Sequence, residues 1–195
     1  MKAGELFAGY GGLALAVHEV FDAETAWVAE FDPAPSKILA ERFPGVPNLG
    51  DVTAVDWTAV EPVDIIAGGS PCQDVSQAGR RAGMTEGTRS NLWVAMRQAI
   101  ETIRPEWVVW ENVQGALSAK ATSESDMEHR TGFVGDRPDG PTLRALGRVL
   151  GDLATLGYDA EWRVVRASDV GAPHQRARVF VLAHRERPAE DPVRG

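Results

Sequence analysis

The sequence contains a single cysteine, Cys72, in 195 residues. One thiol excludes an internal disulfide framework and a cysteine-rich zinc site, because both need several cysteines. A reducing compartment is then the simplest setting, and we expect a cytoplasmic protein. Long apolar runs are missing as well. No stretch approaches the roughly 20 residues of a membrane span, so no membrane partner is expected.

Positive charge is scarce in this chain. Lys and Arg number 20 against 28 Asp and Glu, which gives a formal net charge of −8. Non-specific binding to nucleic acid needs positive charge facing the phosphates, so the composition excludes a protein that binds nucleic acid non-specifically over its whole surface. Any recognition of nucleic acid must come from a local basic surface. Hydrophobic residues make up 44% of the chain, which is ordinary for one globular domain with a real core.

Short apolar runs alternate with amphipathic stretches along the chain. Such alternation is typical of a mostly parallel sheet with helices on both faces, and we expect this α/β architecture. Residues 73–90 and 119–140 show no period and are expected to be long loops, which act as lids or inserts in compact domains. The predicted strands are 3–8, 25–30, 48–52, 63–67, 107–110, 159–166 and 178–183, and the predicted helices are 12–21, 35–43, 91–103 and 141–156.

The first predicted strand runs into a glycine-rich turn. Glycines at such a turn let a ligand approach the backbone, and the following helix offers free N–H groups. Gly9, Gly11 and Ala14 match the dinucleotide fingerprint G-x-G-x-x-G/A. Glu30 lies about where the ribose-binding acid of that fingerprint belongs. An NAD-type site and a tight turn needed only for packing are both compatible with this pattern.

Two acids indicate a ligand that contains adenosine. Glu30 ends the second predicted strand and is placed to accept hydrogen bonds from both ribose hydroxyls. Asp51 ends the third and is placed to accept from an adenine amine. NAD and S-adenosylmethionine share these groups and differ at the reactive end. Nicotinamide carries a hydride, whereas a sulfonium carries a methyl group that needs a nucleophile, and the sequence offers a nucleophile.

That candidate nucleophile is Cys72, which follows the predicted strand 63–67 after two glycines, a serine and a proline. Ligands of open α/β sheets bind at the carboxyl ends of the strands. A thiol with a pKa of about 8.5 becomes nucleophilic when positive charge or N–H donors lower that pKa. Arg80, Arg81 and Arg89 follow in the same loop. A lone cysteine is otherwise a small buried hydrophobe, but this loop position favours the nucleophile.

An acid and two arginines are the remaining chemical candidates. Glu111 follows the apolar run 107–110 and is expected at the same sheet edge as Cys72. A carboxyl group desolvated there holds a proton and acts as a general acid, although a purely structural carboxylate is the alternative. Arg176 and Arg178 point to one face if the last strand begins early, and they would hold a phosphate or a heteroaromatic carbonyl. Without a histidine or cysteine cluster, no metal site is expected.

Together, these motifs resemble the cytosine-5 DNA methyltransferases. The likeness runs from about residue 3 to residue 184, in the family's own order. Pro-Cys-Gln, Glu-Asn-Val and Gln-Arg-x-Arg in succession carry it, because a glycine turn alone occurs in many nucleotide-binding folds. The matching segments are 5–12, 30–32, 50–51, 70–73, 111–113 and 175–178.

The resemblance implies a class I S-adenosylmethionine-dependent methyltransferase fold (Rossmann-like) and a covalent mechanism. A cytosine flipped out of double-stranded DNA would receive the Cys72 thiolate at C6 while Glu111 protonates N3. Arg176 and Arg178 would orient the base, C5 would take the methyl group, and loss of the C5 proton would release the cysteine. The resemblance, together with the glycine fingerprint, gives these cofactor-binding residues: Phe7, Gly9, Gly11, Gly12, Glu30, Phe31, Asp51 and Leu92.

The sequence departs from this family in one respect. Family members continue past the paired arginines into a target-recognition region and return with a final helix, whereas this sequence stops at Gly195. We therefore expect residues 1–184 to form a catalytic domain without that region and 185–195 to form a charged tail. A second chain that supplies the recognition region would fit the acidic composition, as would a truncated gene product.

Three other functions stay open on the residues alone. A branch of the same family methylates tRNA with the same constellation, so RNA is an alternative substrate. A non-catalytic relative that only binds the cofactor is the second alternative, and a nicotinamide oxidoreductase is the third. If DNA is the substrate, the resemblance implies DNA methylation of the restriction–modification type.

Overall fold

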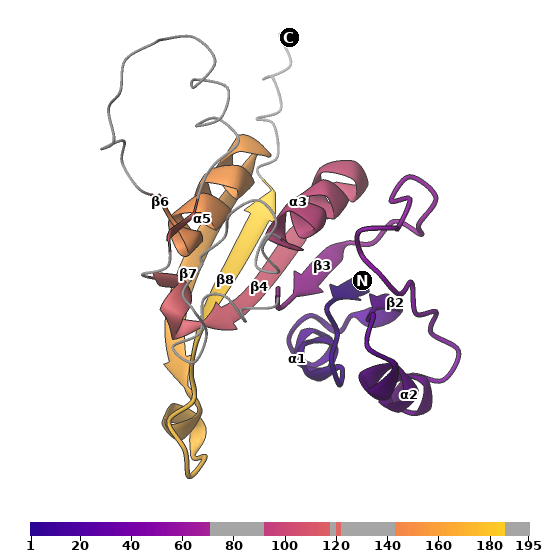
Figure 1. The fold of residues 1–195 in the computed structure, drawn as a ribbon, viewed down its shortest axis with the longest axis horizontal. Coiled ribbons are helices and arrows are strands. Elements are labelled where there is room, and N and C mark those ends of the chain that lie inside the picture. Colours follow the sequence, from indigo (N-terminus) through magenta and orange to yellow (C-terminus); the bar gives the residue numbers. More distant parts are fainter. Residues whose placement is uncertain (71–91, 118–119, 122–142, 186–195) are drawn as a thin grey trace, which may run out of the picture.

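The computed structural model describes residues 1–70, 92–117, 120–121 and 143–185, and it is built on one six-stranded sheet (Figure 1). The strand order is β2-β1-β3-β4-β8-β7. The strands are β1 (Lys2–Leu6), β2 (Glu24–Ala29), β3 (Ile65–Gly68), β4 (Trp107–Val113), β7 (Tyr158–Arg166) and β8 (Ala177–Arg185), with β5 (Lys120–Ala121) and β6 (Leu143–Arg144) paired separately. The helices are α1 (Gly12–Phe21), α2 (Pro33–Arg42), α3 (Leu92–Ile103) and α5 (Ala145–Thr155), and the 3-10 turns are η2 (Gln114–Leu117) and η4 (Ala167–Val170).

Five strands of the sheet run in one direction and β8 runs in the other. β1 pairs in parallel with β2 and β3, and β3 pairs in parallel with β4. β8 is antiparallel to both of its neighbours, β4 and β7. The prediction of a mostly parallel α/β sheet is therefore confirmed. The antiparallel β8 matters for the site, because its first residues meet the carboxyl end of β4.

Helices pack on both faces of the sheet, as predicted. The main core lies under α3 and α5, where Trp93, Met96 and Leu153 are fully buried against Trp110 and Val181 of the sheet. α1 lies on the opposite face, and its apolar side packs in a smaller cluster with β1 and β3. α2 packs beside it through a third cluster that joins it to β2. None of the helices in the described residues is long and apolar enough to cross a membrane.

The predicted strand at 48–52 is wrong. Asn48 makes only an isolated bridge with Val28. Backbone hydrogen bonds join the segments only at Val28, which donates to Pro47 and accepts from Leu49. Beyond them, the side chain of Asn48 accepts from the amide of Glu30 and donates to its carbonyl, at 2.9 and 3.1 Å, so no longer ladder forms. Gly50 then turns the chain with a φ of 74°, which an extended strand does not allow.

Two other boundaries differ in ways that affect the site. β4 continues to Val113, so Glu111 lies within the strand rather than after it, opposite Phe180 of β8. The pairing with β8 provides the extra backbone hydrogen bonds that extend β4. The helix predicted at 141–156 begins at Ala145, because Leu143 and Arg144 form β6. The remaining helices and strands lie within a few residues of their predicted bounds.

Candidate active site

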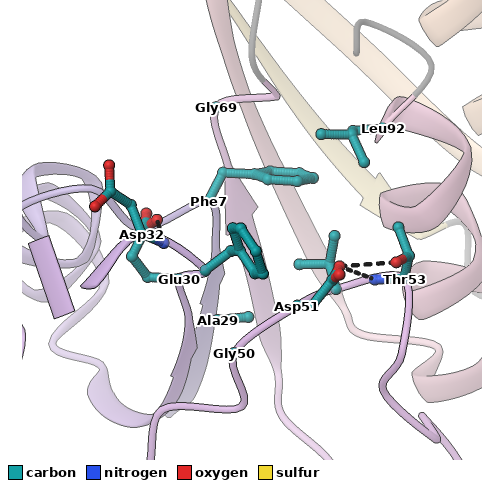
Figure 2. Close-up of a pocket in the computed structure, with 11 residues that line it drawn as sticks. Phe7, Ala29, Glu30, Asp32, Gly50, Asp51, Thr53, Gly69 and Leu92 are labelled. Carbon is teal, nitrogen blue, oxygen red and sulfur yellow. Dashed lines mark hydrogen bonds between the residues drawn. The ribbon is translucent and has the colours of Figure 1, made fainter. Parts of the chain in front are cut away.

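The principal cavity opens at the carboxyl ends of β1, β2 and β3 and has a volume of about 540 Å³ (Figure 2). This is the edge where parallel α/β sheets bind ligands. Figure 2 shows the ring of Phe7 extending toward Leu92, with Asp51 and Thr53 on the wall below them. The lining consists of Phe7, Ala29, Glu30, Phe31, Asp32, Gly50, Asp51, Val52, Thr53, Gly69 and Leu92.

Five of the eight residues predicted to bind the cofactor line this cavity, and three glycines do not. Gly9 and Gly11 adopt left-handed φ values of 54° and 76°, and Gly11 is the N-cap of α1. A Cβ atom added at Gly11 would lie 2.4 Å from the ring of Phe43. These glycines, with Gly12 at the first position of α1, therefore shape the turn behind the cavity rather than form its wall.

Sequence reasoning missed six of the lining residues. Ala29, Val52 and Thr53 adjoin predicted residues in the chain. Ala29 reaches the wall as the last residue of β2, and the path of residues 48–53 brings Val52 and Thr53 there. Asp32 is the N-cap of α2, and its side chain accepts from the amide of Ala34. The sequence offered a signal for this role, because an acid followed by a proline is typical of the start of a helix. The other two missed residues are Gly50 and Gly69.

Glu30 connects three parts of the site through its carboxylate. Oε2 accepts a hydrogen bond of 2.8 Å from the amide of Gly9, and Oε1 accepts one of 2.8 Å from the amide of Asp32. A carboxylate offers about four acceptor positions, so both oxygens keep capacity for ribose hydroxyls. The side chain is thereby held by the glycine turn on one side and by the start of α2 on the other.

Asp51 is fixed in a similar way by its neighbour Thr53. The amide and the hydroxyl of Thr53 donate to Oδ1 at 2.9 and 2.8 Å. These hydrogen bonds lower the pKa of Asp51, so the carboxylate is ionised and ready to accept from an amine. Phe31 stands 76% exposed at the cavity wall, where an aromatic face is available for stacking on a planar base.

The charge of the cavity bears on the two cofactor hypotheses, NAD and S-adenosylmethionine. Glu30, Asp32 and Asp51 line it, and none of the described lining residues is Lys or Arg. In a dinucleotide site, the pyrophosphate binds the free amides at the helix start. Here Glu5, 4% exposed behind the turn, already accepts from the amide of Ala14 in the first turn of α1. Carboxylates around the turn repel a pyrophosphate and suit a positively charged sulfonium.

Glu111 and Arg178 form an ion pair at the same edge of the sheet. Arg178 Nε lies 2.8 Å from Glu111 Oε1, and both side chains are partly buried, 22% and 28% exposed. The antiparallel register places Arg178 diagonally opposite Glu111 on one face of the sheet. Burial raises the pKa of Glu111, and Arg178 and then Arg176 offset only part of that effect. The pKa of Glu111 therefore stays above its ordinary value despite the two arginines.

The two predicted arginines do not share a strand face. β8 begins at Ala177, so Arg176 precedes the strand, and its φ of 20° turns the backbone away from the extended course. The condition for the predicted alignment with Arg178, an early strand start, is therefore not met. Arg176 still lies close enough for its charge to lower the pKa of Glu111. The predicted nucleophile Cys72 lies outside the described residues, as does the predicted loop 73–90.

Gly69 joins the cavity to the ion pair. It lines the cavity, and a Cβ atom built on it would lie 3.1 Å from Glu111 Oε2. Its neighbour Ser70 is anchored to β4, because Trp110 Nε1 donates to Ser70 Oγ at 3.1 Å and Asn112 Nδ2 donates to the Ser70 carbonyl at 3.3 Å. The chain thus leaves β3 at a fixed point beside the acid. No cluster of three or more His, Cys, Asp or Glu that would hold a metal occurs among the described residues.

Comparisons with known proteins agree with this arrangement. The family model for C-5 cytosine-specific DNA methylase matches residues 1–193. The Type II methyltransferase M2.BsuMI of Bacillus subtilis is 32% identical over 187 residues, which cover 94% of this chain and 42% of that protein. A DNA N-6-adenine-methyltransferase of Escherichia phage P1 is 32% identical over 189 residues, which cover 81% of this chain and 25% of that protein.

A comparison with solved structures supports the same fold. The S. pombe Dnmt2 methyltransferase matches with a TM-score of 0.65 at 18% identity, over 98% of this chain and 51% of that chain. The likeness supports the Rossmann-like methyltransferase fold. The chain spans less than half the length of the two curated relatives. With the family model matched over nearly the whole sequence, the chain belongs to the C-5 cytosine-specific DNA methylase family.

Proposed function

We propose that this chain is the catalytic part of a DNA cytosine-5 methyltransferase. The observation that carries the proposal is the Glu111–Arg178 ion pair, which lies beside Gly69, a residue that also lines the acid-lined cavity. A general acid is thereby adjacent to the place where the methyl donor would bind. Membership of the family gives the reaction class, and we propose residues 1–184 as the catalytic domain.

The residues perform complementary steps in the proposed reaction. The Cys72 thiolate forms a bond to C6 of a flipped cytosine, and Glu111 delivers its proton to N3, so that electron density moves to C5. Arg178 pairs with Glu111 and holds the carboxyl group against the base. S-adenosylmethionine, when bound, supplies an electrophilic methyl group. After C5 has gained the methyl group, its proton is lost to solvent and the C6–sulfur bond breaks to return the Cys72 thiolate. The proton on N3 returns to Glu111, which completes the cycle.

The cavity residues suit the shape and charge of S-adenosylmethionine. Glu30 is placed for the ribose hydroxyls, Asp51 for the adenine amine and Phe31 for the adenine face. Thermal shift measurements with S-adenosylhomocysteine and with NAD test this assignment. We expect stabilisation by S-adenosylhomocysteine alone, whereas stabilisation by NAD alone would restore the oxidoreductase hypothesis.

We propose that DNA recognition depends on polypeptide outside these 195 residues, on the same chain or on a second one. The net charge of −8 provides no general attraction to phosphate. The relatives are more than twice as long as the matched region. As further parts of the proposed function, we infer a cytoplasmic location and a role in restriction–modification. Co-purification with the product of an adjacent reading frame, and a gain of DNA binding in that complex, would support a second chain.

Covalent trapping tests the proposed reaction directly. DNA of mixed sequence that contains 5-fluorocytosine should form a denaturation-resistant adduct with the protein when S-adenosylmethionine and the polypeptide that supplies DNA recognition are both present, because fluorine at C5 prevents the final proton loss. We expect Cys72→Ser to abolish the adduct and Glu111→Gln to slow its formation by about 100-fold. Glu101→Gln, an exposed change on α3, is the matched control and should have no effect.

The same assay separates the alternative substrates. Fluorinated RNA replaces the DNA in a parallel reaction, and adducts on RNA alone would end the DNA assignment. Methylated products are also analysed for 5-methylcytosine and N6-methyladenine, because the phage P1 relative is named for adenine. Adenine methylation that persists in Cys72→Ser would contradict the C5 mechanism. Cofactor binding without any transfer, even in the complex with a partner, would favour the non-catalytic alternative.

A further inference from the structure

Glu5 is a buried acid to which the proposed mechanism assigns no step. It lies in β1 and is only 4% exposed. Its Oε2 accepts a hydrogen bond of 3.0 Å from the amide of Ala14, and the amide of Leu13 also donates to the carboxylate. Both amides belong to the first turn of α1. The acid therefore ties that turn to the strand beneath it.

This tie replaces the missing cap of α1. The first amides of a helix have no partner within the helix and are commonly satisfied by the side chain of the N-cap residue. The N-cap here is Gly11, which has no side chain that could accept them. A carboxylate from the neighbouring strand takes that role.

The backbone between Glu5 and α1 is strained. Phe7 has a φ of 55°, which is uncommon for a residue other than glycine, and Gly9 and Gly11 are also left-handed. Residues in such conformations persist only when the surrounding structure holds them in place. At the cavity side, Glu30 holds the turn through the amide of Gly9 at 2.8 Å. At the helix side, Glu5 is the corresponding holder.

We propose that Glu5 is a positioning residue for the cofactor: its carboxylate holds the amides of Leu13 and Ala14, and through them it fixes the turn that presents Phe7 and Glu30 to the cavity. The proposal rests on the assignment of this cavity to S-adenosylmethionine. It adds a residue that never touches the cofactor and yet sets its affinity.

The surroundings of Glu5 make this hold sensitive to pH. Its strand neighbours by register are Val28 and Ala67, both apolar and buried. Burial raises the pKa of Glu5 from the ordinary 4.5 to about 7, and the nearby charge of Glu30 adds to that effect. The two amide hydrogen bonds lower the pKa and offset part of the rise. A protonated carboxyl group is a weaker acceptor, so the hold should loosen as the pH falls below neutrality.

The test is a calorimetric titration of the full chain with S-adenosylhomocysteine at about pH 6 and about pH 8. Three proteins are compared: the wild type, Glu5→Gln and Glu19→Gln. Gln has the shape of the protonated acid and cannot ionise. Glu19 is an exposed acid on α1, so the control removes the same charge from the same helix. Titration of the ligand itself contributes equally to all three proteins.

We expect the wild type and Glu19→Gln to bind about fivefold more tightly at the higher pH, with no such gain in Glu5→Gln. At the lower pH, the three affinities should agree. An equal pH dependence in Glu5→Gln, or an affinity equal to that of the wild type at both values, would overturn the proposal. Absence of binding by the wild type at every pH would instead remove the assignment of the cavity to this cofactor.

Discussion

At the scale of single residues, the buried carboxyl group of Glu5 affects both stability and cofactor binding. Removing water from an ionised acid is unfavourable, and two amide hydrogen bonds return only part of that free energy. The ionised form that holds the turn most firmly is therefore also the form that destabilises the fold. Functional sites commonly trade stability for geometry in this way.

The first prediction concerns the free energy of unfolding. The pKa of Glu5 is about 7 in the folded protein and near the ordinary 4.5 when the chain is unfolded. Between these values the folded state binds more protons, so stability conferred by Glu5 is present below about pH 4.5 and is lost as the pH rises through about 7. We expect denaturation to show wild-type stability falling against Glu5→Gln by on the order of 3 kcal/mol over this range. A constant difference between the two proteins would contradict the prediction, and Glu19→Gln should follow the wild type.

At the scale of helices and strands, the site is created where β3, β4 and β8 meet. β3 delivers Gly69 and Ser70, β4 carries Glu111, and β8 returns antiparallel with Arg178 at its start. Trp110 and Asn112 donate hydrogen bonds to Ser70 from the other face of β4, so the end of β3 is tied directly to β4. Small changes at this junction should therefore reach the acid directly.

The second prediction tests this junction with Gly69→Ala. An added Cβ would lie 3.1 Å from Glu111 Oε2, which is closer than an ordinary contact, so the carboxylate must shift by a few tenths of an ångström. We expect the rate of covalent trapping to fall about tenfold while the unfolding midpoint changes little. Gly151→Ala on α5, where a Cβ would meet nothing within 4 Å, is the control and should leave the rate unchanged. An unaltered rate in Gly69→Ala would show that the acid tolerates the displacement.

The elements of this site differed in how well the sequence predicted them. The apolar run at 107–110 and the glycine turn before α1 were readable because their composition allows few alternatives. The extension of β4 to Val113 was not readable, since it depends on pairing with β8, a strand more than 60 residues later. The strand predicted at 48–52 was wrong because Asn48 binds Glu30 through its side chain, and a pattern of apolar residues does not reveal such a hydrogen bond. Glu5 was assigned no role because nothing in the sequence shows that an acid in a strand lies beneath a helix start.

At the scale of the whole molecule, the two faces of the sheet are covered unequally. α3 and α5 cover one face across β4, β8 and β7. On the other face, α1 and α2 pack over β1, β2 and β3, and no described helix covers β8 and β7. Phe180 is partly exposed there, Leu182 is 41% exposed and Val165 is 37% exposed. The same face also carries the charged side chains of Glu161, Arg163 and Arg178, so it is mixed in character. Exposed apolar side chains on an uncovered sheet face still favour association.

The third prediction is that these 195 residues, purified alone, self-associate through this face. Light scattering after gel filtration should show a mean mass that rises with concentration, and Leu182→Gln should reduce that rise. The matched control is Val20→Gln on α1, an apolar side chain that is 75% exposed but lies away from this face. If both variants behave like the wild type and remain monomeric, the bare face does not drive association.

The acid-lined cavity also sorts adenosine-containing molecules by their charge. ATP and S-adenosylmethionine share the groups that Glu30 and Asp51 are placed to hold, and ATP is abundant in cells. Three carboxylates around one opening create a field that slows the approach of a polyphosphate and speeds the approach of a sulfonium. Discrimination against nucleotides would then begin before contact, in the rate of encounter, and the cavity would stay open for its methyl donor in the presence of a large excess of a competitor.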